Sequence, residues 1–484
     1  MVKALAALAA CLASSVALAQ DATAVLRKAS AVMGAEQLNT LRYAGAGGGA
    51  SFGQAFKPGD PWPKLNISSY VRQLDYQAGA IHEDVMRGRA EPKGGGAVPI
   101  AGEGRATTVA SGKLAWNVAG PLPTPRQQAL ESRLHDLWTT PHGVIKAASR
   151  NNAKVDFVTR GGREQAAVSF TEPGVFAATA FFNEDYILER VESRYTDNVM
   201  GDIPVVTTYS EYRIFGPIVF PTRIQQTMAG FPTLDLQVKE VQPNAKVDIA
   251  VPEIVAKSAG TERVAAEKAA DGVWHLAGGS HNSVAIEMKD YVILVESPLN
   301  DGRALAVINE VRKLVPGKPL RYVVNSHNHF DHTGGIRAAA AEGMTVVAQA
   351  QSKAWFEKML ASPARINPDH LAKSGKKGGK VMGVAERHVF DDGARRVEIH
   401  RIHPSDHVDT FLMVYLPQER ILIQADAFTP GAPNSAPPAA PNNYNQRVLV
   451  ENIERKNLKV DRHLPLHGRI VPNAELYRAA GKPL

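Results

Sequence analysis

The sequence predicts two structural units, a mostly antiparallel β domain followed by an α/β domain. Its 484 residues exceed the length of one ordinary domain. Short runs that alternate apolar and polar residues fill the chain up to about residue 250. Beyond residue 265, apolar strands alternate with helical stretches, which is typical of a layered α/β structure. These three observations predict both the division and the class of each part.

The composition is that of a globular protein, with 44% hydrophobic and 21% charged residues. The formal net charge of +7 is modest, and the densest basic run, residues 373–380 (KSGKKGGK), is half Gly and Ser. We interpret this run as a solvated flexible loop, because a nucleic-acid-binding protein concentrates its basic residues in a stripe. Nucleic acid is therefore not an expected partner.

The first nineteen residues have the pattern of a secretory signal peptide. Lys3 supplies a positive start, an apolar run extends from Ala4 to Ala19, and Ala17-Leu18-Ala19 is a small-x-small cleavage signal. The run is too short for a comfortable membrane span. We therefore expect residues 1–19 to be removed and the mature protein to be periplasmic or secreted.

Cys11, the single cysteine of the sequence, lies inside this leader. Residues 8–11 (LAAC) also look like a bacterial lipoprotein signal, which would leave a lipid anchor on Cys11, but the apolar stretch before it is short. Cleavage after Ala19 would instead leave no cysteine. Any metal would then be held by His, Asp or Glu side chains.

Residues 20–250 form the predicted N-terminal β-rich domain, and residues 251–265 the predicted linker. An amphipathic helix is expected from Asp21 to about Gly34, and a helical interruption from about Thr124 to Ser149. The remainder is expected to be antiparallel sheet with one face covered. The stretch from Tyr209 to Pro252 is similar to the periplasmic lipoprotein-carrier fold. The similarity lies in the sequences of residues 212–221 (YRIFGPIVFP) and 241–244 (VQPN).

The chemistry is expected in residues 266–484, because twelve of the fifteen histidines follow Ala265. The apolar strand Tyr322-Val323-Val324 runs directly into residues 327–332 (HNHFDH). Imidazole and carboxylate groups at this density suit zinc or another first-row divalent ion. Gly334 and Gly335 relax the turn, so that a helix can begin close to the metal.

The stretch from Ser326 to Gly335 (SHNHFDHTGG) resembles the signature of the metallo-β-lactamase superfamily. The resemblance implies an αββα four-layer sandwich for residues 266–484 and a site for two divalent metal ions, expected to be Zn²⁺. It also implies which residues hold them. The first ion would be held by His327, His329 and His407, the second by Asp331, His332 and His467, with Asp426 between the two.

The last three of these positions are chosen by sequence context. His407 precedes an apolar strand, Asp426 ends the strand of residues 421–425, and His467 lies in a Pro-Leu-His-Gly turn. Three other histidines compete with them. His403 remains an alternative to His407, His400 is expected to be structural, and His463 is expected at the surface.

Two features depart from the commoner sequence pattern of the superfamily. A strand that usually ends in a supporting Asp here reads Leu-Val-Glu-Ser-Pro, so that Glu296 is the candidate for that role. The segments from Ser362 to Arg395 and from Thr429 to Tyr444 are longer than a minimal core needs, and we expect them to form the walls of the substrate pocket. The aromatic residues that either line this pocket or belong to ordinary packing are Trp355, Phe356, Phe428 and Tyr444.

The function implied by the resemblance is that of a dinuclear metal-dependent hydrolase. A metal-bridged hydroxide would attack an ester, lactone or amide bond of a small molecule, β-lactams included, and Asp331 would be the catalytic residue that orients it and moves its proton. Asp426 favours thioester, lactone and phosphoester hydrolases over β-lactamases. The alternatives are a phosphodiesterase or nuclease of the same superfamily, and an exported lipid- or apolar-ligand-binding protein with a non-catalytic metal site.

Overall fold

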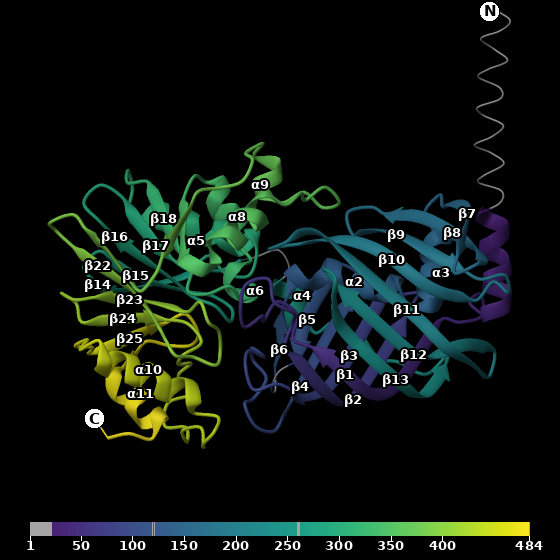
Figure 1. Cartoon of the computed structure of the whole chain (residues 1–484), viewed down its shortest axis with the longest axis horizontal. Coiled ribbons are helices and arrows are strands. Elements are labelled where there is room, and N and C mark those ends of the chain that lie inside the picture. Colours follow the sequence, from purple (N-terminus) through teal and green to yellow (C-terminus); the bar gives the residue numbers. More distant parts are fainter. Residues whose placement is uncertain (1–21, 119, 121, 259–261, 484) are drawn as a thin grey trace, which may run out of the picture.

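The structure, a computed structural model, describes residues 22–118, 120, 122–258 and 262–483. The predicted signal peptide, its cleavage site and Cys11 lie outside these residues, and their roles stay predictions. None of the described helices is long and apolar enough to cross a membrane. Figure 1 shows a large N-terminal sheet beside two smaller sheets formed by the second half of the chain.

The N-terminal part is one antiparallel sheet of thirteen strands, in the order β6-β5-β4-β3-β2-β1-β13-β12-β11-β10-β9-β8-β7. The prediction of a mostly antiparallel β region is therefore confirmed. Strand β1 pairs with β13, and a Cβ atom at Gly47 would lie 2.1 Å from the Asp235 carbonyl oxygen, so only glycine fits there. The strands are β1 Thr40–Ala50, β2 Lys64–Asp75, β3 Ala80–Arg89, β4 Glu103–Ser111, β5 Leu114–Val118, β6 Pro123–Pro125, β7 Lys154–Arg160, β8 Arg163–Glu172, β9 Phe176–Phe182, β10 Leu188–Asp197, β11 Gly201–Phe215, β12 Ile218–Met228 and β13 Phe231–Pro243.

Three helices pack against this sheet and share one buried apolar core with it. Residues 22–33 are helical, as the periodicity predicts. The second predicted helix is divided into η1 (Gln127–Ala129), α2 (Leu130–Trp138) and α3 (Pro141–Arg150). Pro141 has no N–H to continue α2, and the Thr140 side chain accepts a hydrogen bond from the Gly143 N–H, which starts α3.

Two mixed sheets form the second half of the chain, as expected for an α/β region. The seven-stranded sheet runs in sequence order from β14 to β20 and is parallel from β17 onward. The six-stranded sheet runs from β21 to β26, with β24 and β25 parallel. The strands are β14 Ala265–Ala270, β15 Val273–Ala277, β16 Ser283–Glu287, β17 Val292–Val295, β18 Leu320–Val324, β19 Thr345–Gln349, β20 Val381–Val384, β21 Arg387–Asp391, β22 Arg396–Arg401, β23 Leu412–Leu416, β24 Ile421–Gln424, β25 Arg462–Pro465 and β26 Val471–Pro472.

Alternating side chains divide the packing of this half into two cores. On β17, Ile293 and Val295 belong to a core shared with the six-stranded sheet, whereas Val292 and Leu294 face a core shared with α5, α7 and α8. Helices α10 and α11 pack into the first of these cores beside the six-stranded sheet (Figure 1). The helical segments are α5 Asp301–Leu314, α6 Phe330–Thr333, α7 Ile336–Ala341, η2 Ala350–Ser352, α8 Lys353–Ala361, α9 His370–Lys373, α10 Tyr444–Arg455 and α11 Asn473–Ala480.

The predicted linker contains a short helix, α4 (Glu253–Ser258). Val255 of this helix is buried against Val109 and Trp116 of the N-terminal sheet. The chain therefore stays attached to the edge of that sheet before it enters β14. The domain boundaries at residues 250 and 265, and the similarity to the lipoprotein-carrier fold, stay predictions.

His142 makes the stability of the N-terminal part depend on pH. Its ring is fully buried, its Nε2 atom lies 2.9 Å from the Met33 carbonyl oxygen, and burial lowers its pKa to about 4. The unfolded imidazole has a pKa of about 6.5, so it takes up a proton first as the pH falls. The resulting stabilisation is complete above pH 6.5 and is lost progressively between about pH 6.5 and 4.

We predict that His142→Gln removes this contribution. The free energy of unfolding of the wild type should fall by about 2–3 kcal/mol more than that of the variant between pH 7 and 4.5. Urea unfolding of both proteins at several pH values measures the difference. Parallel curves for the two proteins would show that His142 titrates normally.

Candidate metal centre

The predicted site residues lie where strands of the two C-terminal sheets end. Strand β18 leads into residues 327–332, of which residues 330–333 form the short helix α6. Asp426 and His467 each follow the end of a parallel strand, β24 and β25 respectively. His407 lies in the connection between β22 and β23. Because the two sheets pack face to face, these strand ends bring all the predicted residues together.

The first group consists of His327, His329, His407 and Asp426, whose ligand atoms all lie within 4.8 Å of one another. The His407 Nε2 atom is 2.9 Å from Asp426 Oδ2 and 3.4 Å from His327 Nε2. The three imidazoles are buried. This is the set that the sequence predicts for one metal ion.

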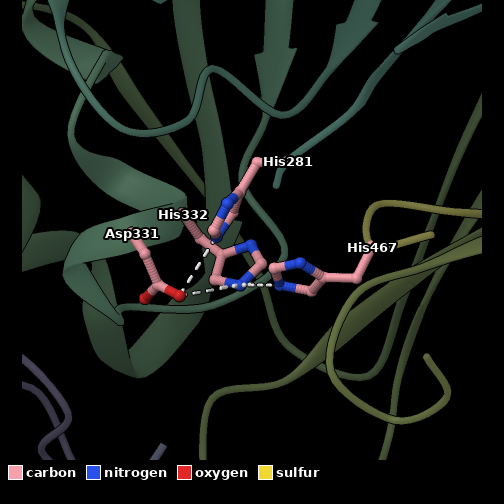
Figure 2. A group of neighbouring side chains, drawn as sticks. All are labelled: His281, Asp331, His332 and His467. Carbon is pink, nitrogen blue, oxygen red and sulfur yellow. Dashed lines mark hydrogen bonds and ion pairs between the residues drawn. The ribbon is translucent and has the colours of Figure 1, made fainter. Parts of the chain in front are cut away.

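The second group consists of Asp331, His332, His467 and a further residue, His281 (Figure 2). The Nε2 atoms of His332 and His467 are 3.1 Å apart. They lie 2.9 and 2.8 Å respectively from Asp426 Oδ1. Asp426 therefore directs one carboxylate oxygen to each group, which is the position between two sites that the sequence predicts.

His281 was missed by sequence reasoning. It lies between β15 and β16 in the stretch Gly-Gly-Ser-His-Asn, a lone histidine in a turn with no companion ligand nearby in sequence. Its Nε2 atom is 3.1 Å from Asp331 Oδ2, and its ring centroid is 4.1 Å from that of His467. The local signal, a histidine between two buried strands of the same sheet, does not distinguish a site residue from a core residue.

Outer hydrogen bonds orient three of the imidazoles. The Nδ1 atoms of His332 and His467 lie 2.8 Å from Glu296 Oε2 and from the Ser280 carbonyl oxygen respectively. Since these partners are acceptors, Nδ1 carries a proton in both rings and Nε2 is the atom that faces inward. His327 Nδ1 is 2.9 Å from the Ser326 hydroxyl, which itself donates to Glu296. Such outer partners are typical of metal-binding histidines.

His329 gives a direct test of whether a cation fits. Its side chain is fully buried, and neither ring nitrogen has a hydrogen-bond partner among the described residues. A buried polar ring without a partner costs free energy. The ring lies 4.5 Å from that of His327 and 4.6 Å from that of His407, centroid to centroid. A metal ion that accepts a nitrogen lone pair satisfies this group.

The protonation states of His327, His329 and the two carboxylates also fit metal binding. Burial, reinforced by neighbouring imidazoles, lowers the pKa of His329 to about 3 and that of His327 well below its usual value. Burial opposes ionisation of Asp331 and Asp426, but the charge on His332 outweighs it and holds both pKa values well below the usual range. Neutral imidazoles and ionised carboxylates are the forms that bind cations. Burial lowers the pKa of His332 and of His467, but Asp426 outweighs it and raises both, so a bound cation would take the place of a proton on each of these two rings.

Glu296 supports the segment of residues 325–332 through four hydrogen bonds. Its carboxylate is fully buried and accepts hydrogen bonds from the Asn325 amide (3.0 Å), the Ser326 N–H (3.1 Å), the Ser326 hydroxyl (2.6 Å) and His332 Nδ1 (2.8 Å). A buried charge needs such a set of donors. Glu296 therefore occupies the supporting position that the sequence left open.

The N-terminal sheet also reaches the site, which the sequence did not reveal. In the connection between β1 and β2, the Gln54 amide donates to Asp331 Oδ1 at 2.9 Å, and the Gly53 carbonyl accepts from the Phe330 N–H at 3.0 Å. The Ala55 carbonyl accepts from the Asn328 amide at 3.1 Å. One loop of the first sheet thus contacts residues 327–332 of the second half, which we call the metal loop.

A cleft of about 1080 Å³ opens beside Asp331. Part of the segment predicted as a wall, residues 367–369 and 373, lines it. The other predicted segment, Thr429 to Tyr444, does not line this cleft; its place is taken by the N-terminal elements β6, η1 and α2. Phe356 and Phe428 belong to the buried cores, so the packing alternative holds for them. Trp355 and Tyr444 pack against those cores and do not line the cleft either.

The competing histidines lie outside both groups. His400 is buried in β22, where its Nε2 atom is 2.9 Å from Glu398, and His403 is exposed. The prediction of a surface position for His463 is wrong. This ring is fully buried in β25, 2.9 Å from Asn473, because β25 lies between β24 and β26 and beneath Phe428.

Residues 276–467 match the family model described as the metallo-beta-lactamase superfamily. This part of the chain belongs to that superfamily. The match spans the strand ends and nine site residues described above, from His281 through Glu296 to His467. This matched part of the chain also carries the two candidate His/Asp metal-binding groups, and the superfamily suggests a hydrolase.

A curated relative is the linear primary-alkylsulfatase of Pseudomonas sp. (strain ATCC 19151), which is 21% identical over 228 residues. The chain spans 42% of the length of that relative, and the match covers 39% of this chain. A metallo-beta-lactamase from Pontibacter korlensis is similar at 16% identity and a TM-score of 0.35, over 45% of this chain and 98% of the other. A mono-zinc metallo-beta-lactamase from Pseudomonas aeruginosa is similar at 19% identity and a TM-score of 0.33, over 45% and 93%.

Gly53 tests the contact between the N-terminal loop and the metal loop. Its φ is +76°, and a Cβ atom there would lie 2.6 Å from Phe330 Cγ. We expect Gly53→Ala to lower the free energy of unfolding by about 1–3 kcal/mol more than Gly59→Ala. Gly59 has a similar φ of +87° but its nearest contact would be 3.9 Å away, so backbone strain is matched. Equal losses in the two variants would exclude tight docking at Phe330.

Glu296→Gln should destabilise the metal-free protein by about 3 kcal/mol, because a neutral amide presents two N–H groups to donors that need an acceptor. Denaturant unfolding in the presence of a chelator measures this loss. Glu287→Gln serves as the control, since Glu287 is partly exposed and paired with Lys318 at 2.7 Å, and it should cost less than about 1 kcal/mol. A comparable loss in both variants would contradict the supporting role of Glu296.

Proposed function

We propose that the protein is a dinuclear metal-dependent hydrolase that cleaves an ester, lactone or amide bond of a small molecule. The observation that supports this most is the placement of Asp426. Its Oδ2 atom is 2.9 Å from His407 in the first group, and its Oδ1 atom is 2.8 Å from His467 in the second. A carboxylate shared in this way suits two ions held close together.

We propose the following ligands, with Zn²⁺ as the ion that best suits nitrogen and carboxylate donors without thiolates. The first ion would be held by His327, His329 and His407, the second by Asp331, His332 and His467, with Asp426 between them. Two such ions, when bound, supply a nucleophile from water near neutral pH and polarise the bond that it attacks.

Asp331 is the residue that we propose to orient the nucleophile and to move its proton to the leaving group. Both of its oxygens already have donors. Gln54 donates to Oδ1, and the neutral His281, whose Nδ1 lies 2.7 Å from the Ser280 hydroxyl, has its remaining N–H for Oδ2. Asp331 is also the candidate ligand that borders the cleft, so a substrate there meets it directly.

The finer architecture and the location belong to the same proposal. We propose that the two packed sheets, with α5, α7 and α8 on one outer side and α10 and α11 on the other, form the αββα four-layer sandwich of the superfamily. The leader pattern of residues 1–19 supports export to the periplasm or the medium. A small molecule remains the proposed substrate, and nucleic acid is not a proposed partner.

Hydrolysis of a sulfate ester is a second candidate function. The similarity to a protein named as a linear primary-alkylsulfatase favours it over the phosphodiesterase and ligand-binding alternatives. The same nucleophile would attack, and the sulfate oxygens would take the place of the carbonyl oxygen. Turnover of an alkyl sulfate alongside lactone, β-lactam, thioester and phosphodiester substrates distinguishes these chemistries.

The central test is His329→Ala. We expect the wild type to bind two zinc ions per chain and the variant to lose at least one, with turnover lowered by about a hundredfold or more. Elemental analysis and kinetics on the best substrate of the panel measure both effects.

His403→Ala is the matched control, because this exposed imidazole lies outside both groups, and it should keep both properties. Unchanged turnover in His329→Ala would exclude the two-metal mechanism. Retained ligand binding without turnover in the wild type would favour a binding protein.

A further inference from the structure

Arg126 brings a positive charge from the N-terminal sheet into the cleft. It stands between β6 and η1, and its backbone N–H donates to the Ala115 carbonyl at 2.8 Å, which fixes its position on the sheet. The cleft that it lines is the one bordered by Asp331. Burial lowers the pKa of Arg126, while Asp331 and then Glu262 act in the opposite direction, so the guanidinium is within electrostatic reach of the candidate metal centre.

The guanidinium of Arg126 has no hydrogen bond or ion pair with any side chain or carbonyl in the described ranges. Arg133, which lies in α2, shows what a structural arginine in this region does. It donates to the carbonyls of Val109 (2.8 Å) and Trp116 (2.7 Å) and to the Asn117 side chain (2.5 Å). A half-buried guanidinium without such partners has its N–H donors free for a ligand in the cleft.

The other cations of the cleft do not share these properties. Lys373 lies at the end of the cleft formed by residues 367–373 and is exposed. Arg263 is exposed as well, and Lys257 is exposed and paired with Glu253 at 2.5 Å. In the same cleft, the rings of Phe52 and Phe330 meet edge to face with centroids 5.3 Å apart and offer an apolar wall. The cleft therefore combines one unpaired, half-buried cation with an aromatic surface.

We propose that Arg126 binds an oxyanionic group of the substrate, so that the enzyme prefers esters or amides that carry a negative charge away from the scissile bond. This inference rests on the proposed hydrolase function. The planar guanidinium forms paired, charge-assisted hydrogen bonds with carboxylate-like groups. A cleft of about 1080 Å³ accommodates a molecule with an apolar body between that group and the reacting bond.

Two chromogenic esters with the same leaving group test the proposal. They are 4-nitrophenyl butyrate and the 4-nitrophenyl monoester of glutaric acid, which differ in a terminal carboxylate. The measured quantity is the ratio of kcat/KM for the charged ester to kcat/KM for the neutral one. We expect Arg126→Gln to lower this ratio by about tenfold or more, as for the loss of a charge-assisted hydrogen bond, and Arg126→Lys to restore part of it.

Lys373→Gln removes the same charge from an exposed position of the same cleft, and it should leave the ratio within about twofold of the wild type. A merely structural role of Arg126 would lower kcat/KM for both esters equally and leave the ratio unchanged. An unchanged ratio in Arg126→Gln, or an equal fall in both variants, overturns the proposal.

A binding measurement separates this proposal from the hydrolase function. Glutaric acid monoanilide carries the same terminal carboxylate but a slowly cleaved bond, and calorimetry gives its Kd for the zinc-loaded protein. We expect the Kd to rise by about tenfold or more in Arg126→Gln and to stay within about twofold in Lys373→Gln. No binding to the wild type, or equal affinity in all three proteins, overturns the role of Arg126 whether or not either ester is hydrolysed.

Discussion

The buried carboxylate of Glu296 is the interaction on which the site loop depends. It joins the end of β17 to the residues that follow β18, and it fixes the ring of His332 at the same time. Removing an ionised carboxylate from water costs several kcal/mol unless donors surround it, so the loop must adopt the one conformation that supplies them. The Glu296 carboxylate holds residues 325, 326 and 332 in one conformation, and this conformation places the histidine rings of the loop relative to one another.

The second constraint is the face-to-face packing of the two C-terminal sheets. It places strand ends from both sheets at one edge, where Asp426 and His467 from the six-stranded sheet meet His332 from the seven-stranded one. Successive side chains of β17 point to opposite faces of the sheet, and each face packs into a different core. Both faces of this strand are therefore buried. The packing of these two apolar sheet faces thus brings the residues of the two candidate metal-binding groups together.

The N-terminal sheet takes part in the same site. Gln54 contacts Asp331, Gly53 fits against Phe330, and Arg126 borders the cleft. Loops on a rigid scaffold are well suited to select a substrate, because their side chains are held in place without belonging to the reacting centre. In this protein the sheet that carries those loops is separate from the sheets that carry the two candidate metal-binding groups, so both halves of the chain line the cleft.

The sequence by itself determined the two classes of structure and the residues of the metal loop. Alternation predicts the antiparallel sheet, and the resemblance to the superfamily, together with the sequence context beside neighbouring strands, predicts His407, Asp426 and His467. Tertiary structure alone decided the places of His281, Gln54 and Arg126, whose neighbours in sequence carry no chemical signal. The buried position of His463, predicted at the surface, has the same origin. Local periodicity records which face of an element is apolar, whereas contacts between turns of different sheets arise only when those faces have packed.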